Sequence, residues 1–266
     1  YQAPTEFIGQ QIKYLETCDS TNTLALKECL EEDIKEGFTW IADHQTQGRG
    51  QRGNTWLSKK GDNLLFSIYL KPKLQNQPHF YFSKAIACGI IEGLQVWSNE
   101  RLPLQIKWPN DIYIGEQKLG GILIENQWAG SQWTHSIVGI GLNINQEEFG
   151  DLRANSLKQF LNKSEHIPRE HVFHAICQSI EKYFKICQTH QFDEIETFYH
   201  DHLFRLNEWN LYQEVENNQI FDGKILQVNE QGLLLMEKQN GYKLYDLKEI
   251  IFILFICLNI LIYFKK

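Results

Sequence analysis

The stretch "LPLQIKWPNDIYIGEQKLGGILIENQW", residues 102–128, decides the fold class of this 266-residue chain. Two apolar segments flank a turn signal at Gly115-Glu116-Gln117, and a further apolar segment, "WTHSIVGIGLNIN", follows at residues 133–145. Strands joined by such short turns must pair antiparallel, because a parallel crossover needs about a dozen residues or more. The stretch therefore predicts a run of antiparallel strands.

Helix and strand patterns alternate on either side of this run. Residues 80–97 repeat apolar side chains every four positions, which predicts a core helix. The unbroken apolar run "NLLFSIYL" at residues 63–70 indicates a strand buried on both faces. Further elements are expected as a strand, turn and helix within residues 11–33, a strand at 38–45, and helices at 169–189 and 192–203. The expected class is α/β (α+β), a mixed sheet with packed helices.

The pattern changes beyond Leu211 to short alternating segments, split at Asp222-Gly223, Gln231-Gly232 and Asn240-Gly241. Turn signals spaced by roughly ten residues are typical of a small antiparallel barrel. We therefore divide the chain into residues 1–211, a small β domain at 212–253, and an apolar tail at 254–266. The apolar end is shorter than the about 20 residues that cross a bilayer. It could be a weak membrane tail, an overrunning strand, or sequence foreign to the domain.

Composition restricts the classes of function. The formal charge of −7 and the pI near 5.7 argue against a broad nucleic-acid surface. Six cysteines without C-x-x-C spacing indicate free thiols in a reducing compartment. The opening "YQAPTEFIGQ" resembles neither a signal peptide nor a transit peptide. A cytoplasmic protein is expected.

The segment "QTQGRGQRGNTW", residues 45–56, places its glycines at the G-x-G-x-x-G spacing of dinucleotide-binding loops. No helix pattern follows Gly53, and Lys73 stands where the acidic residue of that motif would fall, so the dinucleotide interpretation is excluded. Bare backbone beside Arg49 and Arg52 suits a mobile loop that closes over a phosphate or carboxylate. A solvated turn with incidental arginines is the alternative. We call these residues the glycine–arginine loop.

Polar residues gather where the expected strands end: at 19–22, at 45–56, at 107–111 with Lys118, and at Asn143 with Asn145. Loops at strand ends commonly share one side of a sheet, so a common pocket is expected. Each group alone also fits a structural role: a helix cap, a turn, a surface lysine or a turn-closing asparagine.

Together, "CDSTN", "GRGQRGNTW", "KWPNDIYIGEQKLGGILIE" and "GIGLNIN" resemble the motifs of the biotin protein ligases, over about residues 12–250. The resemblance implies a catalytic domain like that of class II aminoacyl-tRNA synthetases, followed by an SH3-like domain. It also implies that the biotin carboxylate attacks the α-phosphate of Mg-ATP to give biotinyl-5'-AMP. A lysine of a biotin carboxyl carrier domain then takes the biotin. Lipoate ligases and octanoyltransferases share the fold without this motif pair.

The resemblance also assigns residues to roles. Lys118, Arg49 and Arg52 are expected in catalysis, because positive groups placed beforehand allow two anions to join. Biotin is expected at Ser20, Thr21, Asn22, Gln45, Arg49, Gly50, Gln51, Lys118 and Gly121. ATP and the adenylate are expected at Gly48, Arg49, Gly50, Gln51, Arg52, Gly53, Trp56, Asn110, Asp111, Lys118 and Asn143. Mg²⁺ is expected with ATP near Asp111, with no fixed protein ligand set.

Two departures from the family pattern matter. Gln51 stands where many relatives carry a second arginine, so the loop is expected to retain biotinyl-AMP less tightly. The "CDSTN" motif begins at Cys18, which leaves no room for the winged helix-turn-helix of bifunctional relatives, so operator binding is not expected. A second copy of the chain is a candidate partner at an exposed sheet edge. Three rivals stay open: a lipoate or octanoate ligase, a non-catalytic biotin or nucleotide sensor, and a membrane-tethered adaptor.

Overall fold

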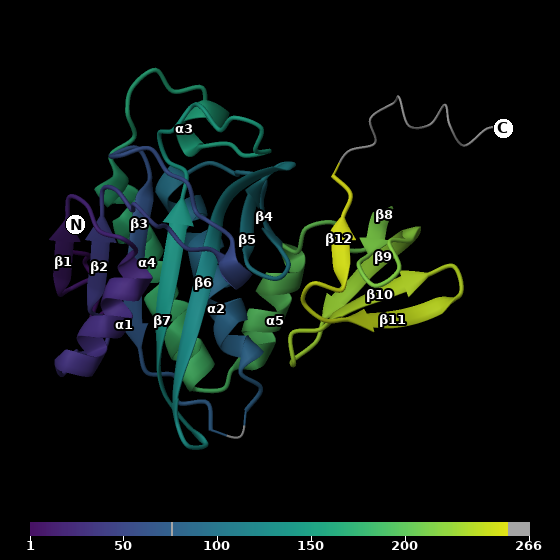
Figure 1. The fold of residues 1–266 in the computed structure, drawn as a ribbon, viewed down its shortest axis with the longest axis horizontal. Helices are drawn as coiled ribbons and strands as arrows, with labels where there is room; N and C mark the ends of the chain where they lie inside the picture. The colour runs from purple at the N-terminus through teal and green to yellow at the C-terminus, as the bar shows by residue number, and fades with distance from the viewer. Residues whose placement is uncertain (76, 255–266) are drawn as a thin grey trace. The chain divides into compact units, whose positions relative to one another are not determined.

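The computed structural model describes residues 1–75 and 77–254, which form two compact units, one up to His202 and one from Leu203 onward (Figure 1). The domain boundary expected at residue 211 falls inside a strand that begins at Trp209. Most of the expected apolar tail, residues 255–266, lies outside the described residues. Within the described ranges, no helix is both long and apolar enough to cross a membrane.

The first unit contains a seven-stranded mixed sheet in the order β1-β2-β3-β7-β6-β5-β4. Its strands are β1 Ile12–Leu15, β2 Thr39–Ala42, β3 Leu64–Leu70, β4 Leu104–Lys107, β5 Asp111–Ile114, β6 Gln117–Ala129 and β7 Gln132–Leu142. Strand β1 runs parallel to β2, and every other neighbouring pair is antiparallel. The antiparallel run predicted from residues 102–145 is confirmed as β4 to β7.

The helices of this unit are α1 Thr21–Glu31, α2 Phe80–Ser98, α3 Leu157–Phe160, α4 Arg169–Gln188 and α5 Phe192–Asp201. Figure 1 shows α2 and α4 behind the sheet and α1 in front of it. Helices α2 and α4 approach closely: a Cβ added at Gly89 would lie 2.6 Å from the Cα of Ile180, and one at Gly93 would lie 2.6 Å from the Cα of Ile176. Glycine at both positions lets the two backbones touch.

Strand β3 shows how the two faces of the sheet differ. All seven of its residues are buried, as its apolar run predicts. Phe66 packs edge-to-face on Phe173 of α4, with ring centroids 5.2 Å apart. Ser67 points to the opposite face, because successive strand residues alternate, and there its hydroxyl reaches Thr21 and Asn22 of α1. Strand β3 therefore separates an α4 face from an α1 face.

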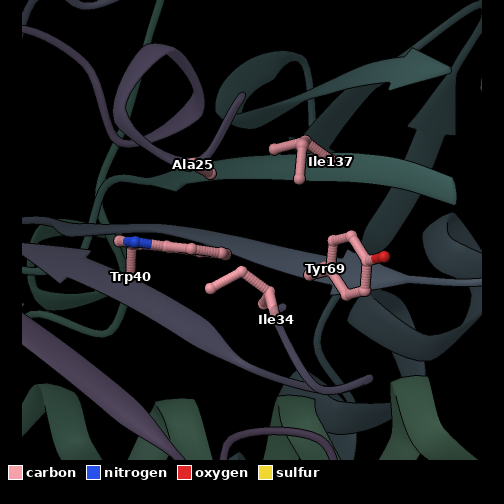
Figure 2. Close-up of a cluster of buried hydrophobic side chains, with 5 residues drawn as sticks. All are labelled: Ala25, Ile34, Trp40, Tyr69 and Ile137. Carbon is pink, nitrogen blue, oxygen red and sulfur yellow. The ribbon is translucent and has the colours of Figure 1, made fainter. Parts of the chain in front are cut away.

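A buried apolar cluster fixes α1 on its face of the sheet. Its members are Ala25, Ile34, Trp40, Tyr69 and Ile137 (Figure 2). The indole N–H of Trp40 donates a 2.8 Å hydrogen bond to Glu28 of α1. Each large side chain buried here contributes about 1.5–3 kcal/mol. The cluster holds α1 against β2, β3 and β7.

The second unit is a five-stranded antiparallel sheet in the order β11-β10-β9-β8-β12. Its strands are β8 Trp209–Glu214, β9 Ile220–Val228, β10 Leu234–Lys238, β11 Gly241–Tyr245 and β12 Ile250–Phe252. The turns predicted at Gln231-Gly232 and Asn240-Gly241 are confirmed, but the split predicted at Asp222-Gly223 is wrong, because both residues lie within β9.

Close packing explains the glycine at position 223. A Cβ there would lie 2.8 Å from the Met236 side chain and 2.9 Å from that of Phe221. A glycine inside a strand often marks such an approach rather than a turn. The sequence did not predict this role because the Met236 and Tyr212 side chains that approach Gly223 come from the neighbouring strands β10 and β8.

Candidate functional site

Three glycines on the α1 face of the sheet form the floor of the candidate site. Gly121 of β6 pairs with Gly141 of β7, and Gly139 lies two residues along β7 on the same face. A Cβ at Gly139 would lie 2.1 Å from Oδ1 of Asn22, and one at Gly141 would lie 2.6 Å from the Trp56 ring. Because these backbones are bare, side chains from α1 and from the glycine–arginine loop rest directly on the sheet.

The first group of polar side chains surrounds Asn22. We call Thr21, Asn22, Gln45 and Ser67 the polar cluster. The Ser67 hydroxyl lies 2.5 Å from Oδ1 of Asn22 and 2.7 Å from Oγ1 of Thr21. The Thr21 backbone N–H donates to Oε1 of Gln45 over 2.7 Å, and its hydroxyl reaches the same oxygen over 3.1 Å. The cluster is a continuous hydrogen-bonded chain that joins α1, β3 and the start of the glycine–arginine loop.

Glu125 of β6 connects this cluster to Arg49 of the glycine–arginine loop. Arg49 donates to both carboxylate oxygens of Glu125, at 2.7 and 3.2 Å, and to the Thr23 hydroxyl at 3.3 Å. Asn22 donates to Glu125 over 2.9 Å and to the carbonyl of Leu123 over 3.2 Å. A bidentate arginine–carboxylate pair fixes the orientation of the guanidinium as well as its distance from the carboxylate.

The second group gathers around Lys118, which we call the lysine site. The Lys118 ammonium forms a 2.6 Å ion pair with Asp111 and lies 5.6 Å from the Trp56 ring centroid. A Cβ at Gly121 would lie 3.4 Å from the Trp56 ring and 3.6 Å from both charged atoms. An ammonium, an indole and bare backbone thus face one another beside the polar cluster.

A β-bulge brings Lys118 to this face. Asp111 pairs with Gly121 and Ile112 with Gly120, but Tyr113 pairs with Lys118, so Leu119 is the extra residue. Without the bulge, residues three apart on a strand would point to opposite faces. The residue 153–155 segment holds the bulge from the other side: the Lys118 N–H donates to the carbonyl of Arg153, and its own carbonyl accepts from Asn155.

The glycine–arginine loop folds back on itself. The Trp56 N–H donates to the carbonyl of Gly48 over 2.8 Å, and the Gly50 N–H donates to that of Asn54 over 2.7 Å. A short 3-10 helix, η1 Gln51–Gly53, forms the tip, with Gly53 at a φ of +86°. The Arg52 side chain lies outside what the structure describes, so its expected catalytic role stays a prediction.

Several expected ligand residues already bond within the fold. Ser20 caps α1 by accepting from the Thr23 N–H. Asn110 donates to the carbonyl of Ile122 over 2.7 Å, and Asn143 donates to that of Asn155 over 3.2 Å. These three side chains shape the loops around the site, and their expected contacts with ligands stay predictions.

Cys18 of the "CDSTN" motif lies next to the polar cluster. Burial, with a smaller contribution from the charge of Asp19, raises the pKa of its thiol to about 11. The thiol is therefore protonated at neutral pH, which does not suit a nucleophile, since the thiolate is the reactive form.

Sequence reasoning did not identify Ser67, Glu125, Gly139 or Gly141. Two signals were available: Ser67 is the polar residue in an otherwise apolar strand, and both glycines lie two apart in "VGIGL". Alternation would have put those glycines on one face. Nothing in the sequence showed which partner strand would bring Gly121 opposite them.

Comparisons with known proteins agree with this geometry. The model of the Biotin/lipoate A/B protein ligase family matches residues 14–143. The bifunctional ligase/repressor BirA of Bacillus spizizenii is 32% identical over 245 residues, which cover 90% of this chain and 73% of that protein. The biotin–protein ligase of Homo sapiens is 30% identical over 145 residues, which cover 53% of this chain and 20% of that protein.

Solved structures extend the likeness to the whole fold. The biotin protein ligase from Aquifex aeolicus, in complex with biotin and ATP, matches with a TM-score of 0.74 at 26% identity, over 91% of this chain and 98% of that one. The fold expected from the sequence motifs is therefore confirmed. This chain belongs to the biotin/lipoate A/B protein ligase family.

Proposed function

We propose that this chain is an ATP-dependent ligase that adenylates biotin and transfers it to a lysine of a biotin carboxyl carrier domain. One observation carries the proposal: the lysine site and the polar cluster lie side by side on the bare glycine floor. The relatives named biotin–protein ligase and the Aquifex structure with biotin and ATP support it.

The proposed chemistry needs a positive group between two anions. A carboxylate oxygen of biotin bonds to the α-phosphorus of ATP, and the bond from that phosphorus to pyrophosphate breaks. Lys118 would stabilise the charge that develops there, and the Asp111 carboxylate holds its ammonium in place beforehand. In the second step the carrier amine attacks the activated carbonyl, loses a proton, and AMP leaves.

The polar cluster provides the proposed site for the biotin ring. A ureido group has two N–H donors and one carbonyl acceptor. Thr21, Asn22 and Gln45 carry both donors and acceptors, and all three contact one another or Ser67 within the fold. Lipoate has no ureido group to pair with these buried groups, which would disfavour it. The cluster therefore favours biotin over lipoate.

The lysine site and the loop provide the proposed adenylate site. The indole N–H of Trp56 is buried and finds no acceptor among residues 1–75 and 77–254, so a ligand oxygen would pair with it only after the ring moves off the floor. The same ring offers a flat surface for adenine. Arg49, Arg52 and the loop glycines would cover the mixed anhydride and exclude water. Mg²⁺ would enter with ATP near Asp111.

The proposal also includes a biotin carboxyl carrier domain as the partner, a cytoplasmic location and no repressor activity. The acidic charge of −7 argues against DNA binding. The matched Bacillus relative carries the name ligase/repressor, so this point needs its own experiment. A mobility-shift titration with operator DNA at low salt should give no retarded species for this chain, and specific retardation would contradict it.

Pyrophosphate exchange into ATP tests the first half-reaction. Exchange should require Mg²⁺ and biotin, and neither lipoate nor octanoate should replace biotin. Exchange with lipoate instead would move the chain to the lipoate branch of its family and remove the assignment of the polar cluster. Biotin binding without exchange would favour a non-catalytic sensor.

A further inference from the structure

Glu125 has an unusual position between the loop and the floor of the site. One of its carboxylate oxygens, Oε2, accepts from Arg49 of the glycine–arginine loop at 3.2 Å and from Asn22 of the polar cluster at 2.9 Å. The other oxygen accepts from Arg49 alone, at 2.7 Å. This carboxylate on β6 therefore ties the Arg49 part of the loop to the cluster, in addition to the Thr21–Gln45 hydrogen bonds where the loop begins.

The two sides of this connection differ in how firmly they are held. The Asn22 side chain is buried among bonds to Ser67 and to the carbonyl of Leu123, so it fixes Glu125 from the inside. The Arg49 side chain is 43% exposed, and that of Glu125 is 20% exposed. The pair is thus anchored at the cluster and can open toward solvent at the loop.

We propose that Glu125 is a positioning residue that couples closure of the glycine–arginine loop to the state of the polar cluster. A ligand that holds Asn22 in place also holds the carboxylate that keeps Arg49 and its loop down. A loop that is already closed in turn keeps Asn22 ready for the ligand. The coupling to a ligand rests on the proposed function, whereas the positioning of the loop does not.

Tryptic cleavage after Arg52 reports on the loop without any ligand. Glu125→Gln removes the charge and one acceptor while keeping the size of the side chain. Because the pair is partly exposed, its loss should open the loop by a modest factor, so cleavage should be about two- to fivefold faster than in wild type. Unchanged cleavage after Arg52 would overturn the positioning role.

Glu92→Gln is a matched control. Glu92 of α2 pairs with Lys182 at 2.7 Å with side-chain exposures of 22% and 48%, close to the values of the Glu125–Arg49 pair. It lies far from the loop in sequence and should leave cleavage after Arg52 unchanged. If Glu92→Gln gave the same acceleration, global loosening rather than loop opening would explain both results.

A double-mutant cycle assigns the effect to the pair. Arg49→Gln still leaves the cleavage site after Arg52, so all four proteins can be compared. Glu125→Gln should add less than about twofold in the Arg49→Gln background, because residues in one contact are not additive. Full additivity would overturn the proposal, since Glu125 would then act on the loop by another route.

Protection of the loop by biotin tests the coupling to a ligand. Biotin should slow cleavage of the wild-type loop. The factor by which it slows cleavage of Glu125→Gln should be about two- to fivefold smaller than the factor for wild type. Equal protection in both proteins would overturn the coupling. No protection of wild type at any biotin concentration would contradict the proposed function instead, and the ligand-free cycle would still decide whether Glu125 positions the loop.

Discussion

Gly139→Ala tests whether the bare floor of the site is required for the polar cluster. The added Cβ would lie 2.1 Å from Oδ1, 2.8 Å from Cγ and 2.9 Å from Nδ2 of Asn22, where ordinary contact begins at 3.4 Å. The whole carboxamide must therefore retreat by about 1 Å, an overpacking effect that costs about 1–3 kcal/mol.

The retreat also breaks hydrogen bonds of Asn22. Its bonds to Ser67, to the carbonyl of Leu123 and to Glu125 depend on the present position. Each lost bond destabilises the fold by about 0.5–1.5 kcal/mol. With partial relaxation, we expect Gly139→Ala to lower the free energy of unfolding by about 2–4 kcal/mol.

Urea unfolding followed by tryptophan fluorescence measures this change. Every tryptophan except Trp209 lies in the first unit, so the signal reports mainly on that unit. The matched control is Gly121→Ala, whose Cβ would make ordinary contacts of 3.4–3.6 Å. Its free energy of unfolding should exceed that of wild type by no more than about 1 kcal/mol. A Gly139→Ala midpoint equal to that of Gly121→Ala would refute the argument.

Three further outcomes are expected. Lys118→Ala should reduce pyrophosphate exchange by about 10²–10³-fold while leaving the unfolding midpoint nearly unchanged, and full activity would remove Lys118 from the mechanism. Gln51→Arg should slow release of biotinyl-AMP by about tenfold, as one charge-assisted hydrogen bond would, in a filter-retention assay; equal release rates would contradict the departure argued from Gln51. Bonds from Lys238 and then Tyr245 hold the pKa of the Glu214 carboxyl well below its ordinary 4.5, so its contribution to stability is complete above pH 4.5 and declines as the pH falls. The difference in unfolding free energy between wild type and Glu214→Gln should therefore shrink on acidification. A difference that grew would contradict the lowered pKa of Glu214.

The framework of the fold could be predicted from the sequence because it depends on local signals. Short turns forced β4 to β7 to be antiparallel, and the helix patterns fell close to α2 and α4. The resemblance to a known family then placed Lys118 and Asn22 among the expected site residues. These parts of the structure needed no knowledge of which distant segments meet.

The contacts that fix the site could not be predicted because they join residues far apart in sequence. Glu125 of β6 meets Arg49 of the glycine–arginine loop, and Ser67 of β3 meets Asn22 of α1. The strand position of Gly223 has the same origin: Met236 and Tyr212, which approach it, lie on the neighbouring strands β10 and β8. A glycine in the sequence indicates that close packing is possible, and a carboxylate that hydrogen bonds can be accepted. Neither indicates which side chain will make the contact.

The bulge at Leu119 makes the lysine site sensitive to chain length. Lys118 reaches the ligand face only because β6 carries one residue more than β5 between two paired positions. Inserting one residue between Leu119 and Gly121, with the one-residue bulge kept, would turn the ammonium away from Gly121, whereas deleting Leu119 would remove the bulge and leave Lys118 two positions from Gly121 on the same face. A single-residue insertion should therefore be tolerated at the β6–β7 tip near Gly130 and eliminated between Lys118 and Gly121 in a selection for ligase activity. A substitution scan alone would not reveal that constraint.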